Sequence, residues 1–269
     1  MTAAVDHTPG RPATPAWLVV AEQELRDLWL AGRGLSLTLA FSVLLSVTTY
    51  LVATNRGLNF LEQREAVNLT LQIAVAVGAL LVLLGGGDAI SGERERGTLE
   101  TILLTPAPRR ALVVGKAVAA FSLWLAAFAV SVPYVWFIGR GVGVVGVALV
   151  SGFIVGGLLA LFLAGLGLFV SALAGSNRLS LSIGLFALLA LFAPTQMPTA
   201  AQHGWAGDLL LRIDPLTSGL HYLGKLIVDA HSAGADASWL IAPVVAALLV
   251  PALALGVSGR LSLRRPEHA

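Results

Sequence analysis

The chain has 269 residues, of which 57% are hydrophobic and 12% are charged, and its formal net charge is +2. Soluble domains carry roughly 25% charged residues, so this composition excludes an ordinary soluble protein and predicts an integral membrane protein. The sequence contains no cysteine, which excludes disulfides and thiolate metal sites. The net charge is too small to indicate nucleic-acid binding, and we interpret the weak excess of basic residues as a result of membrane topology.

The first 31 residues divide into a tail and a short helix. Residues 1–15 are polar and rich in proline and threonine, which predicts a disordered tail without a removable signal peptide. Residues 16–31 read AWLVVAEQELRDLWLA and predict an amphipathic helix in the membrane interface, with its tryptophans at headgroup depth. The residues assigned to this helix are Trp17, Glu24, Arg26 and Trp29. The alternative is a plain cytoplasmic extension of the first membrane span.

Six long apolar stretches follow. They cover residues 35–54, 66–86, 112–137, 143–173, 179–194 and 238–258. A hydrocarbon core about 30 Å thick needs roughly 20 apolar residues per helix, and backbone polar groups in lipid must be satisfied within the segment. The sequence therefore predicts an all-α polytopic membrane protein with six transmembrane helices, forming a single domain over residues 1–269.

Lysine and arginine are distributed unevenly around these spans. With a cytoplasmic N-terminus, twelve of the 17 basic residues fall on the cytoplasmic side and five on the outer side. By the positive-inside rule this places both termini and the segment 87–110 in the cytoplasm of a prokaryotic cell.

The spans themselves carry few polar residues. No acid, arginine or histidine lies near the middle of a span, and Asp88 and Lys116 lie at cytoplasmic ends, where side chains can reach water. A proton relay is therefore not expected. Asn68, Thr70 and Gln72 form the strongest polar cluster, which predicts either a substrate path or hydrogen bonds between helices.

Small residues recur every four positions in the fourth span: Ala148, Gly152, Gly156, Ala160 and Ala164. Such a stripe lets another helix backbone approach closely. The pattern alone leaves open whether that helix belongs to the same chain or to a second copy.

One motif is misleading. Residues 219–226, GLHYLGKL, match a phosphate-binding loop except that Leu226 stands where magnesium needs a hydroxyl, and no strand precedes them. We expect no ATPase site in this chain and no catalytic residue. The scattered histidines predict no metal site.

Two segments between spans are more informative. Residues 87–116 hold five Lys or Arg and four Asp or Glu, and Asp88 to Leu104 predicts a short amphipathic helix interrupted at Gly97 and ended by Pro106. This helix is either a solvated loop or a lever that docks on a partner. Residues 195–238 are apolar enough to predict short outer helices packed on the bundle, acting as a gate or only capping helix ends.

The run GERERGTLETILLTPAPRRALVVGK resembles the cytoplasmic loop of type-2 (ABC-2) ABC transporter permeases, and it looks similar to permeases associated with nitrous oxide reductase maturation. EQELRDLWLAGRG resembles the family's interfacial helix, and IDPLTSGLHYLGKL its proline-centred outer segment, with Asp214 in place of the usual Asn before Pro215. The resemblance covers six spans in the expected order. Its most specific elements are Glu93, Arg94, Glu95, Gly97, Thr98, Leu99, Glu100, Leu103, Leu104, Pro106, Gly115 and Lys116, and the residues assigned to coupling also include Arg96.

The resemblance implies the permease subunit of an ATP-driven exporter. It implies an ABC ATPase partner that holds ATP and Mg, a second permease copy or a homologous permease, and surrounding membrane lipid. Residues 93–104 would then be a coupling helix that contacts the ATPase, with Gly97 allowing close approach. The alternative is a membrane scaffold or assembly factor without transport, which would lack a functional ATPase partner.

Overall fold

The structure is a computed structural model that describes residues 15–54, 60–105, 107–197 and 204–260, and in these ranges it is helical without strands. Of the expected tail, residues 1–15, only Pro15 belongs to the described residues, and Pro106 also lies outside them. The longer helices are α1 (Ala16–Leu30), α2 (Arg33–Ala53), α3 (Phe60–Arg96), α5 (Arg109–Ile138), α6 (Val145–Leu173), α7 (Asn177–Phe192) and α11 (Ile241–Val257). The shorter elements are α4 (Leu99–Leu103), η1 (Ala193–Gln196), α9 (Trp205–Ile213), α10 (Pro215–Ile227), η2 (Ala237–Leu240) and η3 (Ser258–Arg260).

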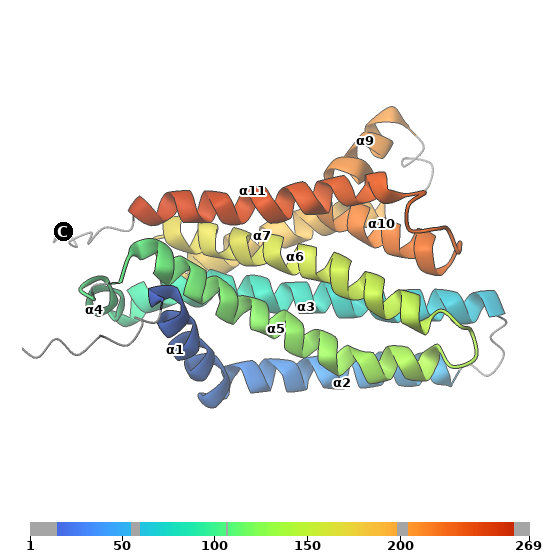
Figure 1. The fold of residues 1–269 in the computed structure, drawn as a ribbon, viewed down its shortest axis with the longest axis horizontal. Helices are drawn as coiled ribbons and strands as arrows, with labels where there is room; N and C mark the ends of the chain where they lie inside the picture. The colour runs from blue at the N-terminus through green and yellow to red at the C-terminus, as the bar shows by residue number, and fades with distance from the viewer. Residues whose placement is uncertain (1–14, 55–59, 106, 198–203, 261–269) are drawn as a thin grey trace, which may run out of the picture.

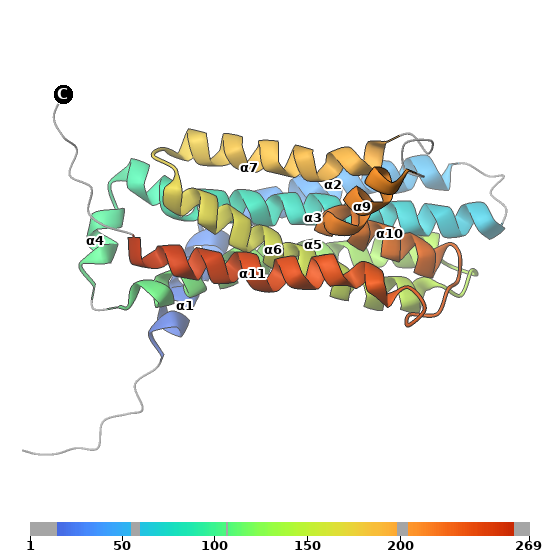
Figure 2. The same ribbon diagram turned by 90° about the horizontal axis from the view of Figure 1, so that it is seen from above.

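Six helical segments in the described part are long and apolar enough to cross a membrane, as the sequence predicts. They run side by side in Figure 1, with α1 inclined across one end of the bundle. Helices α1 and α4 lie at that end, which we call the α4 end, and α9 and α10 lie at the opposite end, which we call the α10 end (Figures 1 and 2). Each polar segment therefore belongs to one end of the bundle.

Helix α3 differs from the prediction of a span over residues 66–86. It has 37 residues, which at 1.5 Å per residue gives roughly 55 Å, well beyond a hydrocarbon core of about 30 Å. The charged residues Glu93 to Arg96 are its last turn, not part of a separate amphipathic helix. Only α4, with five residues, is a separate helix in this segment.

Helix α3 continues through the three glycines at 85–87. Glycine is needed here because neighbouring helices occupy the space that side chains would fill. A Cβ at Gly86 would lie 3.0 Å from the Ala164 carbonyl oxygen, and a Cβ at Gly167 would lie 2.8 Å from the Leu83 carbonyl oxygen. Helices α3 and α6 thus approach backbone to backbone, as small residues allow.

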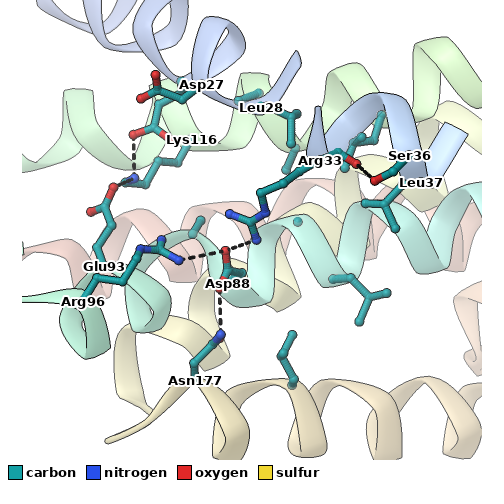
Figure 3. A pocket seen from close by; sticks show the side chains of 18 residues that line it. Asp27, Leu28, Arg33, Ser36, Leu37, Asp88, Glu93, Arg96, Lys116 and Asn177 are labelled. Carbon is teal, nitrogen blue, oxygen red and sulfur yellow. Dashed lines mark hydrogen bonds and ion pairs between the residues drawn. The ribbon is translucent and has the colours of Figure 1, made fainter. Parts of the chain in front are cut away.

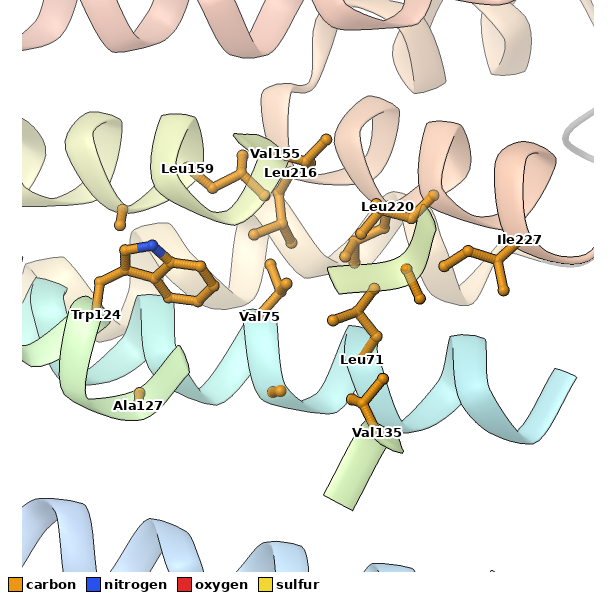
Figure 4. Close-up of a cluster of buried hydrophobic side chains, with 14 of the residues drawn as sticks. Leu71, Val75, Trp124, Ala127, Val135, Val155, Leu159, Leu216, Leu220 and Ile227 are labelled. Atoms are coloured by element: carbon orange, nitrogen blue, oxygen red, sulfur yellow. The ribbon is translucent and has the colours of Figure 1, made fainter. Parts of the chain in front are cut away.

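The core lies between α3, α5, α6 and α10 (Figure 4). Trp124 of α5, Leu71 of α3 and Leu159 of α6 are fully buried, and so is Leu216 of α10. By contrast, α2, α7 and α11 have mostly exposed apolar surfaces, which is the expected state of helix faces that contact lipid. Helix α10 is thus part of the core, although it is too short to span a membrane.

The small-residue stripe of α6 packs within the chain. Ala148, Gly152, Gly156, Ala160 and Ala164 are all buried. A Cβ at Gly152 would meet Leu71 of α3 at 2.6 Å, and a Cβ at Gly156 would meet the Trp124 ring of α5 at 2.2 Å. The neighbours of the stripe are therefore α3 and α5 of the same chain.

Candidate functional site: the polar junction at the α4 end

Helix α3 ends at Gly97 through a hydrogen-bonded turn. Gly97 has φ +73°, its N–H donates to the Arg94 carbonyl, and the Thr98 N–H donates to the Glu93 carbonyl. This is a Schellman motif, which requires a left-handed residue and therefore favours glycine. Among the residues that the structure describes, a Cβ at Gly97 would meet no atom within 4 Å. The turn, and not a close approach to these residues, therefore requires glycine here.

Lys116 of α5 joins three helices at this end. Its Nζ lies 2.6 Å from Glu24 Oε1 of α1 and 2.5 Å from Glu93 Oε1 of α3 (Figure 3). The Lys116 side chain is only 3% exposed, and that of Glu93 is 12% exposed. The expectation that Lys116 reaches water is therefore wrong: it is buried between two carboxylates, because a buried charge needs opposite charges close by.

The residue before Lys116 sets the path of α1. A Cβ at Gly115 would lie 2.5 Å from Val20 Cγ1 and 2.9 Å from the Ala21 backbone nitrogen. Glycine here lets α1 cross directly over α5, which brings Glu24 within reach of Lys116. The pair Gly115–Lys116 therefore seats the first helix on the bundle.

Of the residues assigned to α1, two hold it in place and two do not. Glu24 pairs with Lys116, and the Trp29 Nε1–H donates to Ser122 Oγ of α5 at 3.1 Å. Trp17 is 42% exposed. Within the described part of the chain, the ion pair of Arg26 is with Glu22 of the same helix, and the Arg26 side chain is 68% exposed. Exposed Trp17 fits a helix that lies in an interface.

Asp88 is the centre of a second polar cluster. Its Oδ2 pairs with Arg33 of α2 at 2.5 Å and with Arg96 at 3.8 Å, and its Oδ1 accepts from Asn177 Nδ2 of α7 at 2.7 Å. Beside it, Ser171 Oγ of α6 accepts from the Ile90 and Ser91 backbone N–H groups. Asp88 thus connects the ends of α2, α3 and α7.

Two charged side chains of the α3 terminus cap neighbouring helices. Arg94 donates to the Ala174 carbonyl, and at 3.3 Å to the Ala172 carbonyl, at the C-terminus of α6. Glu95 Oε2 accepts from the Asn177 backbone N–H at 3.2 Å, at the N-terminus of α7. Both contacts oppose the helix dipole with the correct sign of charge.

The predicted coupling residues therefore divide into two groups. Glu93, Arg94 and Lys116 turn into the bundle, whereas Glu95, Arg96, Gly97, Thr98 and Glu100 are exposed and Leu99 is half-buried. Sequence reasoning did not assign roles to Arg33, Asp88 or Asn177. The sequence contains a single indication of their roles, which is that each of these charged or amide side chains lies at the end of a different span.

The three residues predicted as a polar cluster do not face one path. Asn68 and Gln72 are four residues apart on α3 and face α10: Gln72 Nε2 donates to the Leu220 carbonyl at 3.4 Å, and Asn68 lies close to Gly224. Thr70 is buried and its hydroxyl donates to the Ala66 carbonyl of its own helix. Gln72 lines a cavity of about 510 Å³ at the α10 end, between α3, α7 and α10.

Asp214 and Pro215 start α10. Asp214 Oδ2 accepts from the Thr217 N–H at 2.7 Å, and Pro215 is the first helical residue, which is a common way to begin a helix. Burial raises the pKa of Asp214 above its ordinary value, while burial and then Lys225 lower the pKa of His221. Residues 219–226 lie within α10, so the misleading phosphate-loop pattern is a helix and not a loop.

Residues 18–261 match the model of a protein family described as "ABC-2 family transporter protein". The comparison with curated proteins finds no match. No group of three or more potential metal ligands occurs among the residues that the structure describes. The family match covers nearly the whole helical bundle, from α1 to the residues after α11, so the chain belongs to the ABC-2 transporter family, whose members are the membrane components of ABC transporters.

Proposed function

We propose that this chain is the permease subunit of an ATP-driven exporter and that its α4 end docks, in the cytoplasm, on a separate ABC ATPase. The family match supports a membrane component that works with an ABC ATPase. ATP and Mg would be held by that partner. The substrate stays unassigned, and the likeness to permeases of nitrous oxide reductase maturation stays a resemblance of one segment.

The observation that carries this proposal is the division of the α3 terminus into buried and exposed groups. Glu95, in the last turn of α3, and Glu100, in α4, are exposed, while Glu93 and Arg94 bond to α5 and α6. A force applied to α4 would therefore reach several spans through short, buried contacts. Rigid connections of this kind are what a rigid-body switch requires.

Charge reversal at the exposed group tests the proposal. Glu100→Lys is the cleanest variant, because Glu100 is exposed and its side chain forms no hydrogen bond or ion pair among the described residues. Glu95→Lys also removes a cap of α7. Glu65→Lys is the matched control, because Glu65 is exposed near the opposite end of α3. We expect Glu100→Lys to weaken binding of the copurified ATPase by about tenfold, or about 1.4 kcal/mol, and to reduce its stimulation.

The readouts are ATPase activity and transport in proteoliposomes. If Glu95→Lys and Glu100→Lys both leave ATPase stimulation and transport unchanged, the docking proposal is wrong. If no ATPase copurifies with the wild-type chain, the scaffold or assembly role becomes the better description.

Three finer points belong to the same proposal. We place both termini in the cytoplasm of a prokaryotic cell, and we expect two permeases per transporter, identical or homologous. At the outer end, α9 would serve as a movable gate, because it buries only Gly207 and Leu211, whereas α10 is part of the core. Removing residues 204–213 tests the gate: full, tightly coupled transport by that variant would refute it.

A further inference from the structure

A cavity of about 460 Å³ opens among α1, α2, α3, α5 and α7 at the α4 end (Figure 3). This volume lies within the roughly 300–1,000 Å³ of small-molecule sites. The cavity has a polar part, formed by the ends of the helices, and an apolar part deeper in the bundle. The apolar part includes Leu37, Leu84, Leu123 and Leu181. An occupant with a polar head and an apolar tail would fit both parts.

The polar part is itself divided by charge. On one side are Glu24, Asp27 and Glu93, with Lys116 as their single cation, which gives a net charge of −2. On the other side Arg33 and Arg96 share the single acid Asp88, which gives a net charge of +1. In Figure 3 the two arginines point toward Asp88, whereas Asp27 lies near Lys116. Such a lining favours a zwitterion with its two charges a few ångströms apart.

The negative side has unused hydrogen-bond acceptors. Glu93 Oε2 is buried and has no hydrogen-bond partner among the described residues. An unpaired buried carboxylate oxygen is costly, and a donor placed in the cavity beside Glu93 would relieve that cost. Asp27 is exposed at the cavity and likewise has no partner among the residues that the structure describes. A cation with N–H groups fits this side better than a quaternary ammonium, because only the former donates hydrogen bonds.

The position of the cavity points to the bilayer as the source of its occupant. Helix α1, which borders the cavity, exposes Trp17, Leu18, Val19 and Leu30. Exposed tryptophan and aliphatic side chains on a helix at the end of the spans are typical of headgroup depth. The polar part of the cavity thus lies at the level of the lipid headgroups, and its leucines lie at the level of the acyl chains.

We propose that this cavity binds a phospholipid with an ethanolamine headgroup from the adjacent leaflet. The ammonium group would donate to Glu93 and Asp27, the phosphate would contact Arg33 and Arg96, and an acyl chain would lie along the leucines. A choline headgroup lacks N–H donors, and an anionic glycerol headgroup brings no cation to the negative side. The proposal does not depend on whether an ATPase docks on α4.

Native mass spectrometry of the full chain, released from detergent micelles, tests this selectivity. The probes are ethanolamine, choline and glycerol phospholipids with identical acyl chains. We expect the ethanolamine lipid to be retained at least about tenfold more tightly than the choline lipid. Asp27→Asn and Glu93→Gln should reduce that selectivity severalfold, whereas Arg96→Gln should weaken both lipids equally. Asp229→Asn, which removes an acid from the cavity at the α10 end, should change nothing.

Two kinds of result would overturn the proposal. The first kind concerns selectivity: either the wild-type chain retains ethanolamine and choline lipids equally, or its selectivity survives in both Asp27→Asn and Glu93→Gln. Because Asp27 is exposed, its variant is expected to fold even where Glu93→Gln does not. The other concerns the phosphate: if a long-chain primary amine without phosphate displaces the ethanolamine lipid as well as the lipid displaces itself, the assigned contact with Arg33 and Arg96 is wrong.

Discussion

Replacing Lys116 by methionine removes the one cation that holds two acids of different helices together. Methionine keeps most of the apolar stem, so the loss is mainly that of charge. Removing one member of a buried ion pair costs about 3–5 kcal/mol, because the other charge is left unpaired. Glu24, with its side chain 24% exposed, regains water, which places the expected loss near the lower limit, at about 3 kcal/mol.

For a chain of this length, 1 kcal/mol corresponds to about 2–4 °C in the unfolding temperature. Lys116→Met should therefore unfold roughly 6–12 °C lower than the wild type in a thermal assay in detergent. Helix α1 should also be released from α5, which faster trypsin cleavage after Arg26 would report, since that side chain is 68% exposed. The double variant Lys116→Met/Glu93→Gln should recover part of the loss, because it removes the more buried unpaired charge.

Lys225→Met is the matched control. Lys225 pairs at 3.9 Å with Asp229, which lies just beyond the end of α10, and the Lys225 side chain is 30% exposed. An exposed pair of this kind contributes about 0.2–1 kcal/mol, which is a shift of at most about 4 °C. Equal shifts for Lys116→Met and Lys225→Met would refute the view that buried ion pairs anchor α1.

Three further predictions concern the bundle and its α10 end. Gly156→Ala should destabilise the fold by about 1–3 kcal/mol, because its Cβ would lie 2.2 Å from the buried Trp124 ring. The control is Gly157→Ala, whose Cβ would lie 3.7 Å from the same ring and which should be neutral or stabilising in the same thermal assay. Asp214→Ala should cost about 1 kcal/mol through loss of the helix cap, while Asp214→Asn, which still caps and buries no charge, should unfold at or above the wild-type temperature. Because the pKa of His221 is lowered in the fold, the unfolded chain takes up its proton first, so stability should fall as the pH drops below about 6.5; a wild type and a His221→Gln variant with the same pH dependence would contradict this.

The membrane spans could be predicted from the sequence because their length and apolar content are local properties. The C-terminal end of α3 could not be predicted in this way, because the side chains that continue the helix past residue 86 bond to partners far away in the sequence. Glu93 bonds to Lys116, 23 residues later, and Asp88 bonds to Arg33, 55 residues earlier. Without those partners the same charges predict a solvated loop, which is one of the alternatives that the sequence left open.

Helical spacing contains more information than a list of polar residues. Asn68 and Gln72 are four residues apart and share a face of α3, whereas Thr70, two residues from each, points away and bonds to its own helix. That distinction was available in the sequence. What the sequence lacked was the identity of the facing element, α10, whose buried Leu223 and Ile227 show that a segment too short to span can still belong to the core.

Three successive residues in the charged turn that ends α3 contact three different helices. Successive residues of an α-helix point about 100° apart. A single turn therefore presents Glu93 to α5, Arg94 to the end of α6 and Glu95 to the start of α7. The turn cannot rotate without breaking all three contacts. If the ATPase binds the exposed Glu100 next to it, its force would act on a helix end already fixed to α5, α6 and α7, and weakening any one of those contacts should then reduce coupling while docking persists.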